Sequence, residues 1–244
     1  MLRSLGLALL FVLGACRVES DLHNTDSPDL SDPSSAAQPD LTDPSAPAPD
    51  LTGVDPNTGA CEALSPRTEP VTVYALPDEG EAPYVDVLKT ATTSVRVTAY
   101  LMGYGGILDQ LEEKCGAGMD VKILLDQGHD ANDKYETILR DAGCDVKRTD
   151  PMWDHYHAKV IIVDGARAVV STGNYSKTYS VDKERNFVAH VNDPQDVGDL
   201  VSMFEADWNF LPLTMSCTRL VIAPINAKQR LIELIDSATT TLDI

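Results

Sequence analysis

Apolar residues between positions 71 and 148 follow two alternating spacings. Short apolar and β-branched runs, typical of strands, occupy four segments: residues 71–76, 94–101, 120–126 and 145–147. Segments with apolar positions every three or four residues, typical of helices, lie between them: residues 84–90, 107–115 and 132–142. Strands that alternate with helices predict an α/β domain with a mixed, largely parallel sheet flanked by helices.

The next stretch predicts a strand, a tight turn and a return strand. Residues 157–163 form an apolar run that begins with His157 and Lys159, and Asp164 and Gly165 are typical turn residues. Side chains two apart on a strand point the same way, so His157 and Lys159 share one face. A return strand over residues 168–172 brings Thr172 and Asn174 beside that face. These four side chains predict a phosphate site, in which donors hold the oxygens and the imidazole is the nucleophile.

These residues resemble the phospholipase D superfamily. His157, Lys159, Asp164 and Asn174 fit its pattern H-x-K-x4-D-x6-G-S-x-N. The chain departs from the pattern at two positions, because Ser171 replaces the usual Gly and Thr172 the usual Ser.

The resemblance implies a phosphodiesterase with a catalytic set that comprises His157, Lys159, Asp164, Asn174 and Glu184. His157 would form a phosphohistidine intermediate, with Glu184 orienting its imidazole. The phosphate oxygens would be held by Lys159, Thr172 and Asn174. Asp164 would support the turn and the lysine. His155 shares the strand face of His157 and is expected either in the pocket or in the core. This chemistry requires neither a cofactor nor a metal.

The C-terminal part of the chain predicts the start of a second copy of the domain. A further strand over 186–191 and a helix over 196–210 are followed by a strand at 219–223, a helix at 227–237, and a segment from residue 238 that repeats the sequence from residue 91. The resemblance implies two H-x-K motifs face to face, and this chain has one. We therefore expect a catalytic domain over 61–217 and an incomplete repeat over 218–244. Either the chain lacks a second half, which the repeat favours, or it forms a homodimer.

The N-terminal part has the pattern of a bacterial lipoprotein. Residues 1–16 read as a signal peptide that ends in a lipobox, with Cys16 as the lipidated residue. Residues 17–60 repeat Pro-Asp-Leu units and predict a disordered tether. We therefore expect an exported protein anchored by lipid to a bacterial membrane, on its periplasmic or surface side. A plain secretory signal is the alternative.

The four remaining cysteines predict two disulfides in an exported protein. Cys115 and Cys144 lie in comparable turns before predicted strands, which favours their pairing. Cys61 and Cys217 would then join the start of the domain to its end. A zinc site is disfavoured because the cysteines include no closely spaced pair.

Charge bears on the substrate. The net charge is −19, and residues from Cys61 onward contain 17 basic and 29 acidic residues. Such a surface disfavours nucleic acid, which is bound through Lys and Arg. We therefore predict a phospholipase that acts on membrane phospholipid. The alternatives are a nucleic-acid phosphodiesterase, a lipid-forming transferase, and a non-catalytic binding remnant. An apolar lip for the lipid would come from five residues: Tyr100, Met102, Tyr104, Met152 and Trp153.

Overall fold

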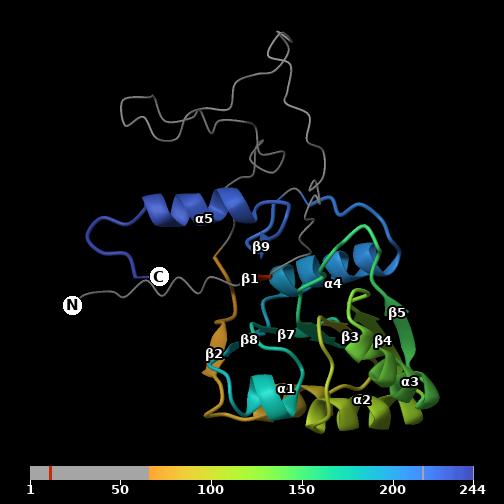
Figure 1. Ribbon diagram of the computed structural model, residues 1–244. Helices are drawn as coiled ribbons and strands as arrows, with labels where there is room; N and C mark the ends of the chain where they lie inside the picture. Colours follow the sequence, from red (N-terminus) through yellow and green to blue (C-terminus); the bar gives the residue numbers. More distant parts are fainter. Residues whose placement is uncertain (1–10, 13–65, 216, 244) are drawn as a thin grey trace, which may run out of the picture.

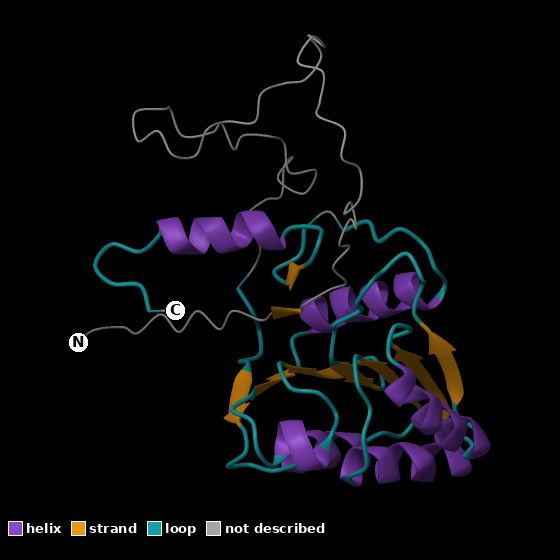
Figure 2. Ribbon diagram, in the orientation of Figure 1, coloured by secondary structure: helices purple, strands orange, loops and turns teal. Residues whose placement is uncertain are grey.

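A computed structural model describes residues 11–12, 66–215 and 217–243, and these form a sheet covered by helices on both faces. Figure 1 shows α4 on one face of the central sheet and α1, α2 and α3 on the other. The same layers are visible in Figure 2, where strands lie between two groups of helices. The predicted α/β fold of the phospholipase D type is confirmed.

The central sheet has seven strands in the order β2-β8-β7-β6-β3-β4-β5. Their bounds are Thr72–Ala75 for β2, Ser94–Ala99 for β3, Asp120–Leu125 for β4, Asp145–Arg148 for β5, Val160–Val163 for β6, Arg167–Ser171 for β7 and Phe187–Val191 for β8.

The prediction of a largely parallel sheet is wrong. Only β3–β4 and β4–β5 pair in parallel, whereas β2–β8, β3–β6, β6–β7 and β7–β8 are antiparallel. Helices cross over between β3, β4 and β5, which keeps those strands parallel. The tight turn at Asp164 and Gly165 instead reverses the chain from β6 into β7.

Six helical segments accompany these strands. Their bounds are Ala82–Lys89 for α1, Gly106–Gly116 for α2, Asp130–Asn132 for the 3-10 helix η1, Asp133–Asp141 for α3, Lys177–Val181 for the π-helix η2 and Pro194–Trp208 for α4. Helix α4 begins where Asp193 caps it, because its carboxylate accepts hydrogen bonds from the N–H groups of Gln195 and Asp196.

The sheet is buried on both faces. Ile161 and Val163 of β6 belong to the core beneath α1, α2 and α3. Val160 and Ile162 belong to the second core, where α4 contributes Leu200 and other apolar side chains. Strands buried on both sides carry continuous apolar runs, which explains the sequence of β6.

The C-terminal segment forms β9 (Val221–Ile222) and helix α5 (Ala227–Asp236). Figure 1 shows them beyond α4, away from the central sheet. β9 pairs in parallel with β1 (Phe11–Val12). The strand expected from residue 238 is absent from the described residues up to 243. An isolated strand has unpaired backbone groups, so this segment lacks the neighbour it would need.

The disulfide between Cys115 and Cys144 is confirmed, with Cα atoms 5.0 Å apart. It joins the end of α2 to the start of β5. Cys217 is also disulfide-bonded, but its predicted partner Cys61 lies outside the described residues. Cys16 and the tether over 17–60 lie outside them too.

Candidate active site

The site forms where β3 and β4 end and β6 begins. Thr98 pairs with Val160 of β6 and with Leu124 of β4, so the residues beyond these strands meet at one end of the sheet. Tyr100 follows β3 and Asp126 follows β4. Open α/β sheets commonly bind ligands beyond the carboxyl ends of their strands.

His157 and Lys159 lie just before β6, not within it as predicted. The strand begins at Val160 because β3 ends at Ala99 and offers no partner to the preceding residues. Lys159 still accepts a hydrogen bond through its carbonyl from the N–H of Ser171. Its Nζ donates to the carbonyl oxygen of His157 at 2.7 Å, which holds the two residues together.

The ring of Tyr100 is the centre of the site. The imidazole of His157 lies 4.3 Å from it, centroid to centroid, and that of His129 lies 4.4 Å away. His155 is more distant, at 6.1 Å. The Nζ of Lys159 lies 5.0 Å from the ring centroid, within range of a cation–π interaction. The three histidines therefore gather around one aromatic side chain, and His155, which is exposed, lies beside the site and not in the core.

Asp126 is the acidic residue that sequence reasoning missed. Its side chain is buried, and its carboxylate accepts hydrogen bonds from the N–H groups of Gly128 and Tyr156. The second bond fixes the backbone immediately before His157. A carboxylate at the carboxyl end of a buried strand was the signal that could have revealed it.

Burial controls the protonation of the two central residues. It lowers the pKa of His157, and the neighbouring charge of Lys159 lowers that pKa further, while Asp126 opposes the change. Burial also lowers the pKa of Lys159 to about 7, again opposed by Asp126. The imidazole is therefore neutral at neutral pH, as a nucleophile must be, and the ammonium is easily deprotonated.

Asn174 and Thr172 follow β7 at the same end of the sheet. The Oδ1 atom of Asn174, a hydrogen-bond acceptor, is buried without a hydrogen-bond partner among the described residues. The Thr172 hydroxyl instead donates to Asn186 at 2.9 Å and accepts from the N–H of Phe187. Its single proton is therefore directed to Asn186, and the phosphate-binding role of Thr172 stays a prediction.

Glu184 does not occupy the place predicted for it. Its side chain is exposed, and Oε2 accepts a hydrogen bond from Asn186 at 3.2 Å. The carboxylate whose charge acts on His157 is that of Asp126. We therefore assign the electrostatic role to Asp126.

Asp164 lies at the opposite end of β6 from His157. Its carboxylate accepts hydrogen bonds from the N–H groups of Thr92, Thr93 and Ser94 and from both threonine hydroxyls. These bonds lower the pKa of Asp164 far below its usual value. Asp164 therefore anchors the turn before β3. The predicted support of the turn is seen, whereas the predicted contact with the lysine is not.

The serine that replaces the usual glycine has a structural partner. Ser171 Oγ lies 2.7 Å from the Tyr84 hydroxyl and accepts from the N–H of Gly173. A side chain at Gly173 would meet the Asn186 amide at 2.8 Å, so the loop needs glycine there.

Sequence comparison identifies the family to which these residues belong. The model described as "Cardiolipin synthase, PLD-like domain" matches residues 84–208, just over half of the chain. The chain belongs to the phospholipase D-like family. A search of curated protein sequences finds no match.

Solved structures show the same fold. Nuc from Salmonella typhimurium, described as a phospholipase D family member, matches with a TM-score of 0.53 and 23% identity, over 57% of this chain and 94% of its own. NucT from Helicobacter pylori matches with a TM-score of 0.50 and 18% identity, over 57% of this chain and 96% of its own. A polyphosphate kinase from Porphyromonas gingivalis matches with a TM-score of 0.57 and 18% identity, over 68% of this chain and 30% of its own.

The residues expected to form an apolar lip are dispersed in this phospholipase D-like domain. Tyr100 is in the site and Met102 is buried, whereas Tyr104 packs against Tyr135. Met152 and Trp153 line a separate cavity on the other face of the sheet. Over the described ranges, no helix is long and apolar enough to cross a bilayer. Those same ranges contain no cluster of three His, Cys, Asp or Glu side chains arranged for a metal.

Proposed function

We propose that this protein is a phosphodiesterase that hydrolyses membrane phospholipid through a covalent intermediate on His157. The observation that carries the proposal is the position of His157 and Lys159 around Tyr100, at the open end of the sheet. His157 is half-buried and Lys159 as a whole is 3% exposed, so both act in a partly dehydrated site.

In the first step, an imidazole nitrogen of His157 attacks phosphorus. A P–N bond forms, the P–O bond to the head-group alcohol breaks, and the alcohol oxygen takes a proton from an acid. Lys159 and the amide of Asn174 stabilise the charge on the non-bridging oxygens. Water then attacks phosphorus and gives a proton to the group that had acted as the acid. The P–N bond breaks, phosphatidic acid leaves, and the imidazole of His157 is free again.

We further propose that a homodimer supplies the acid, as His157 of the partner subunit in its protonated form, while the attacking His157 is neutral. The chain has one H-x-K motif, and two facing motifs are expected for this chemistry. Nuc and NucT support a dimer over a missing half, because one domain here spans 94% and 96% of those chains. Chains of single-domain length therefore exist with this fold.

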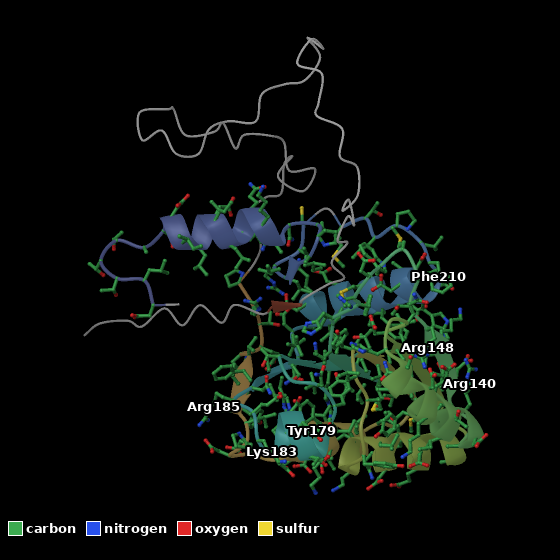
Figure 3. All side chains as sticks on the ribbon, viewed as in Figure 1. Arg140, Arg148, Tyr179, Lys183, Arg185 and Phe210 are labelled. Carbon is green, nitrogen blue, oxygen red and sulfur yellow. A yellow bond between two sulfur atoms is a disulfide. The ribbon has the colours of Figure 1, made fainter. Side chains whose placement is uncertain are left out.

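The distribution of charge supports lipid over nucleic acid. Basic side chains lie in separate places: Figure 3 shows Arg140 and Arg148 on one side of the domain and Lys183 and Arg185 on the other. Several are also paired with acids, such as Arg148 with Glu136 and Asp133. These four basic side chains of the described domain therefore do not form one patch for a polyanion. Anchoring through Cys16, which we retain as a proposal, would place the site near a bilayer.

An assay on the purified protein tests this function. Phosphatidylcholine vesicles and single-stranded DNA are offered in parallel with EDTA present. We expect the parent protein to release head groups from the vesicles. The His157→Ala and Lys159→Met variants are expected to lose this activity. Lys183→Met is the matched control, because its exposed side chain lies outside the site. Cleavage of DNA without head-group release would contradict the lipid substrate.

A further inference from the structure

The cavity lined by Met152 and Trp153 lies on the face of the sheet that carries α4. Its volume is about 350 Å³, and its walls include Met152, Trp153, Tyr156, Met203 and Phe210. Cavities of this size commonly bind small ligands. Among the described residues, none of the side chains that line this cavity belongs to the candidate active site.

Two carboxylates, those of Asp207 and Asp150, line this apolar space. Asp207 lies in the last turn of α4, and its Oδ2 accepts a hydrogen bond from the hydroxyl of Tyr156. Burial raises the pKa of Asp207 to about 6, so the group is mostly ionised at neutral pH. No Lys or Arg of the described ranges forms an ion pair with it.

A lysine beside the end of α4 is already engaged. Lys147 donates from Nζ to the carbonyl oxygen of Trp208 at 3.0 Å and lies over its ring. Asp150, the other carboxylate in the cavity wall, accepts a hydrogen bond from the N–H of Met152. The anionic charge in the cavity is therefore compensated by hydrogen bonds and not by a cation.

A cation with an apolar surface complements these walls. A bare ammonium would lose its hydration on entry, whereas methyl groups spread the charge and reduce this cost. Aromatic rings attract such cations through the negative charge of their faces. A neutral hydrocarbon chain would fit the apolar walls but would further desolvate the carboxylate.

We propose that this cavity binds a small quaternary alkylammonium, with Asp207 as its counter-ion and Trp153, Tyr156 and Phe210 as its aromatic walls. Access is open at the rim, where Met152, Phe210 and Leu211 are at least half exposed. Phe210 lies at the outer edge of the domain beyond α4 (Figure 3). The strongly acidic chain also raises the local concentration of cations. This site is independent of the proposed phosphodiesterase activity.

Isothermal titration of the whole protein tests the proposal. Choline is compared with 3,3-dimethyl-1-butanol, which has the same shape but carbon in place of the charged nitrogen. We expect choline to bind with a dissociation constant near or below the millimolar range and the neutral alcohol at least tenfold more weakly. Equal affinities, or no binding of choline, would overturn the proposal.

Variants locate the counter-ion. Asp207→Asn keeps an acceptor for the Tyr156 hydroxyl, and we expect it to weaken choline binding at least tenfold with unchanged circular dichroism. Asp145→Asn removes the same charge from an exposed position on β5 and is expected to bind as the parent does. A larger loss in Asp150→Asn than in Asp207→Asn would overturn the assignment of Asp207.

Discussion

The hydroxyl groups of Tyr84 and Ser171 lie 2.7 Å apart in the core, beneath the loop that carries Asn174. Tyr84 belongs to the first turn of α1 and Ser171 ends β7. Burial raises the pKa of Tyr84 to about 12, so this is a neutral pair. The serine that departs from the family pattern thus joins a helix to the site.

We predict that Ser171→Gly destabilises the protein by about 1–3 kcal/mol, because the Tyr84 hydroxyl is left buried without this partner. Tyr84→Phe removes the other half of the pair. The double variant should lose about 1 kcal/mol less than the sum of the single losses. Urea unfolding of the four proteins measures this, and strictly additive losses would show that the pair is not coupled.

Asp164→Asn is predicted to lower stability and spare catalysis. The substitution weakens several hydrogen bonds to a charged acceptor, at a cost of about 2–3 kcal/mol. Because the folded-state pKa of Asp164 is lowered, its contribution is present above about pH 4 and is lost as the pH falls. Unfolding free energy and kcat are measured together. His157→Ala should show the opposite pattern, and a stable but inactive Asp164→Asn would place Asp164 in the chemistry.

The pH dependence of kcat/KM should be bell-shaped. His157 must be neutral, and its lowered pKa places the acid limb below about pH 6.5. The basic limb reports the groups that must be protonated, which are Lys159, with a pKa of about 7, and the acid, His157 of the partner subunit.

Asp126→Asn should move the basic limb to lower pH, because the charge that raises the pKa of Lys159 is removed. We expect kcat/KM at pH 7 to fall at least tenfold per folded molecule. Asp130→Asn, an exposed change in η1, is the control. An unshifted basic limb would show that Asp126 does not act on Lys159.

Asp207→Asn should stabilise the protein at neutral pH. The folded-state pKa of about 6 exceeds the unfolded value, so ionisation opposes folding as the pH rises from about 4 to 6. We expect a gain on the order of 1–2 kcal/mol at pH 7.5 and about half of it at pH 5. Tyr156 and Asp150 are the titratable groups that face it in the cavity. Calorimetric unfolding at both pH values measures the change in stability caused by Asp207→Asn. A loss of stability in this variant would show that the carboxylate is stabilising and would contradict the prediction.

Most of the fold could be predicted from the apolar pattern. The helices α1 to α5 and the strands of the central sheet lie within a few residues of the expected segments, because each repeats the period of its own structure. The pattern could not give strand direction, since β6 and most of β7 are buried on both faces like parallel strands. It also predicted a strand from residue 238, where no neighbouring strand is present to pair with it.

The site could be predicted only in part. His157, Lys159 and Asn174 were found through their spacing, and the structure brings them to one end of the sheet. Asp126 and Tyr100 are far from the motif in sequence and reach it through the pairing of β3 with β4 and β6. Spacing alone could not show that Asp164 bonds to the turn before β3, or that Thr172 bonds to Asn186.

A covalent intermediate on His157 is the central claim, and bis(p-nitrophenyl) phosphate tests it most directly. Its leaving group departs without an acid, so the intermediate should accumulate before hydrolysis. Rapid mixing followed by an alkaline quench and peptide mass spectrometry is the measurement. We predict a burst of p-nitrophenolate and a nitrophenylphosphoryl adduct on His157, both absent from His157→Ala. Turnover without an adduct, or an adduct on another residue, would contradict the account.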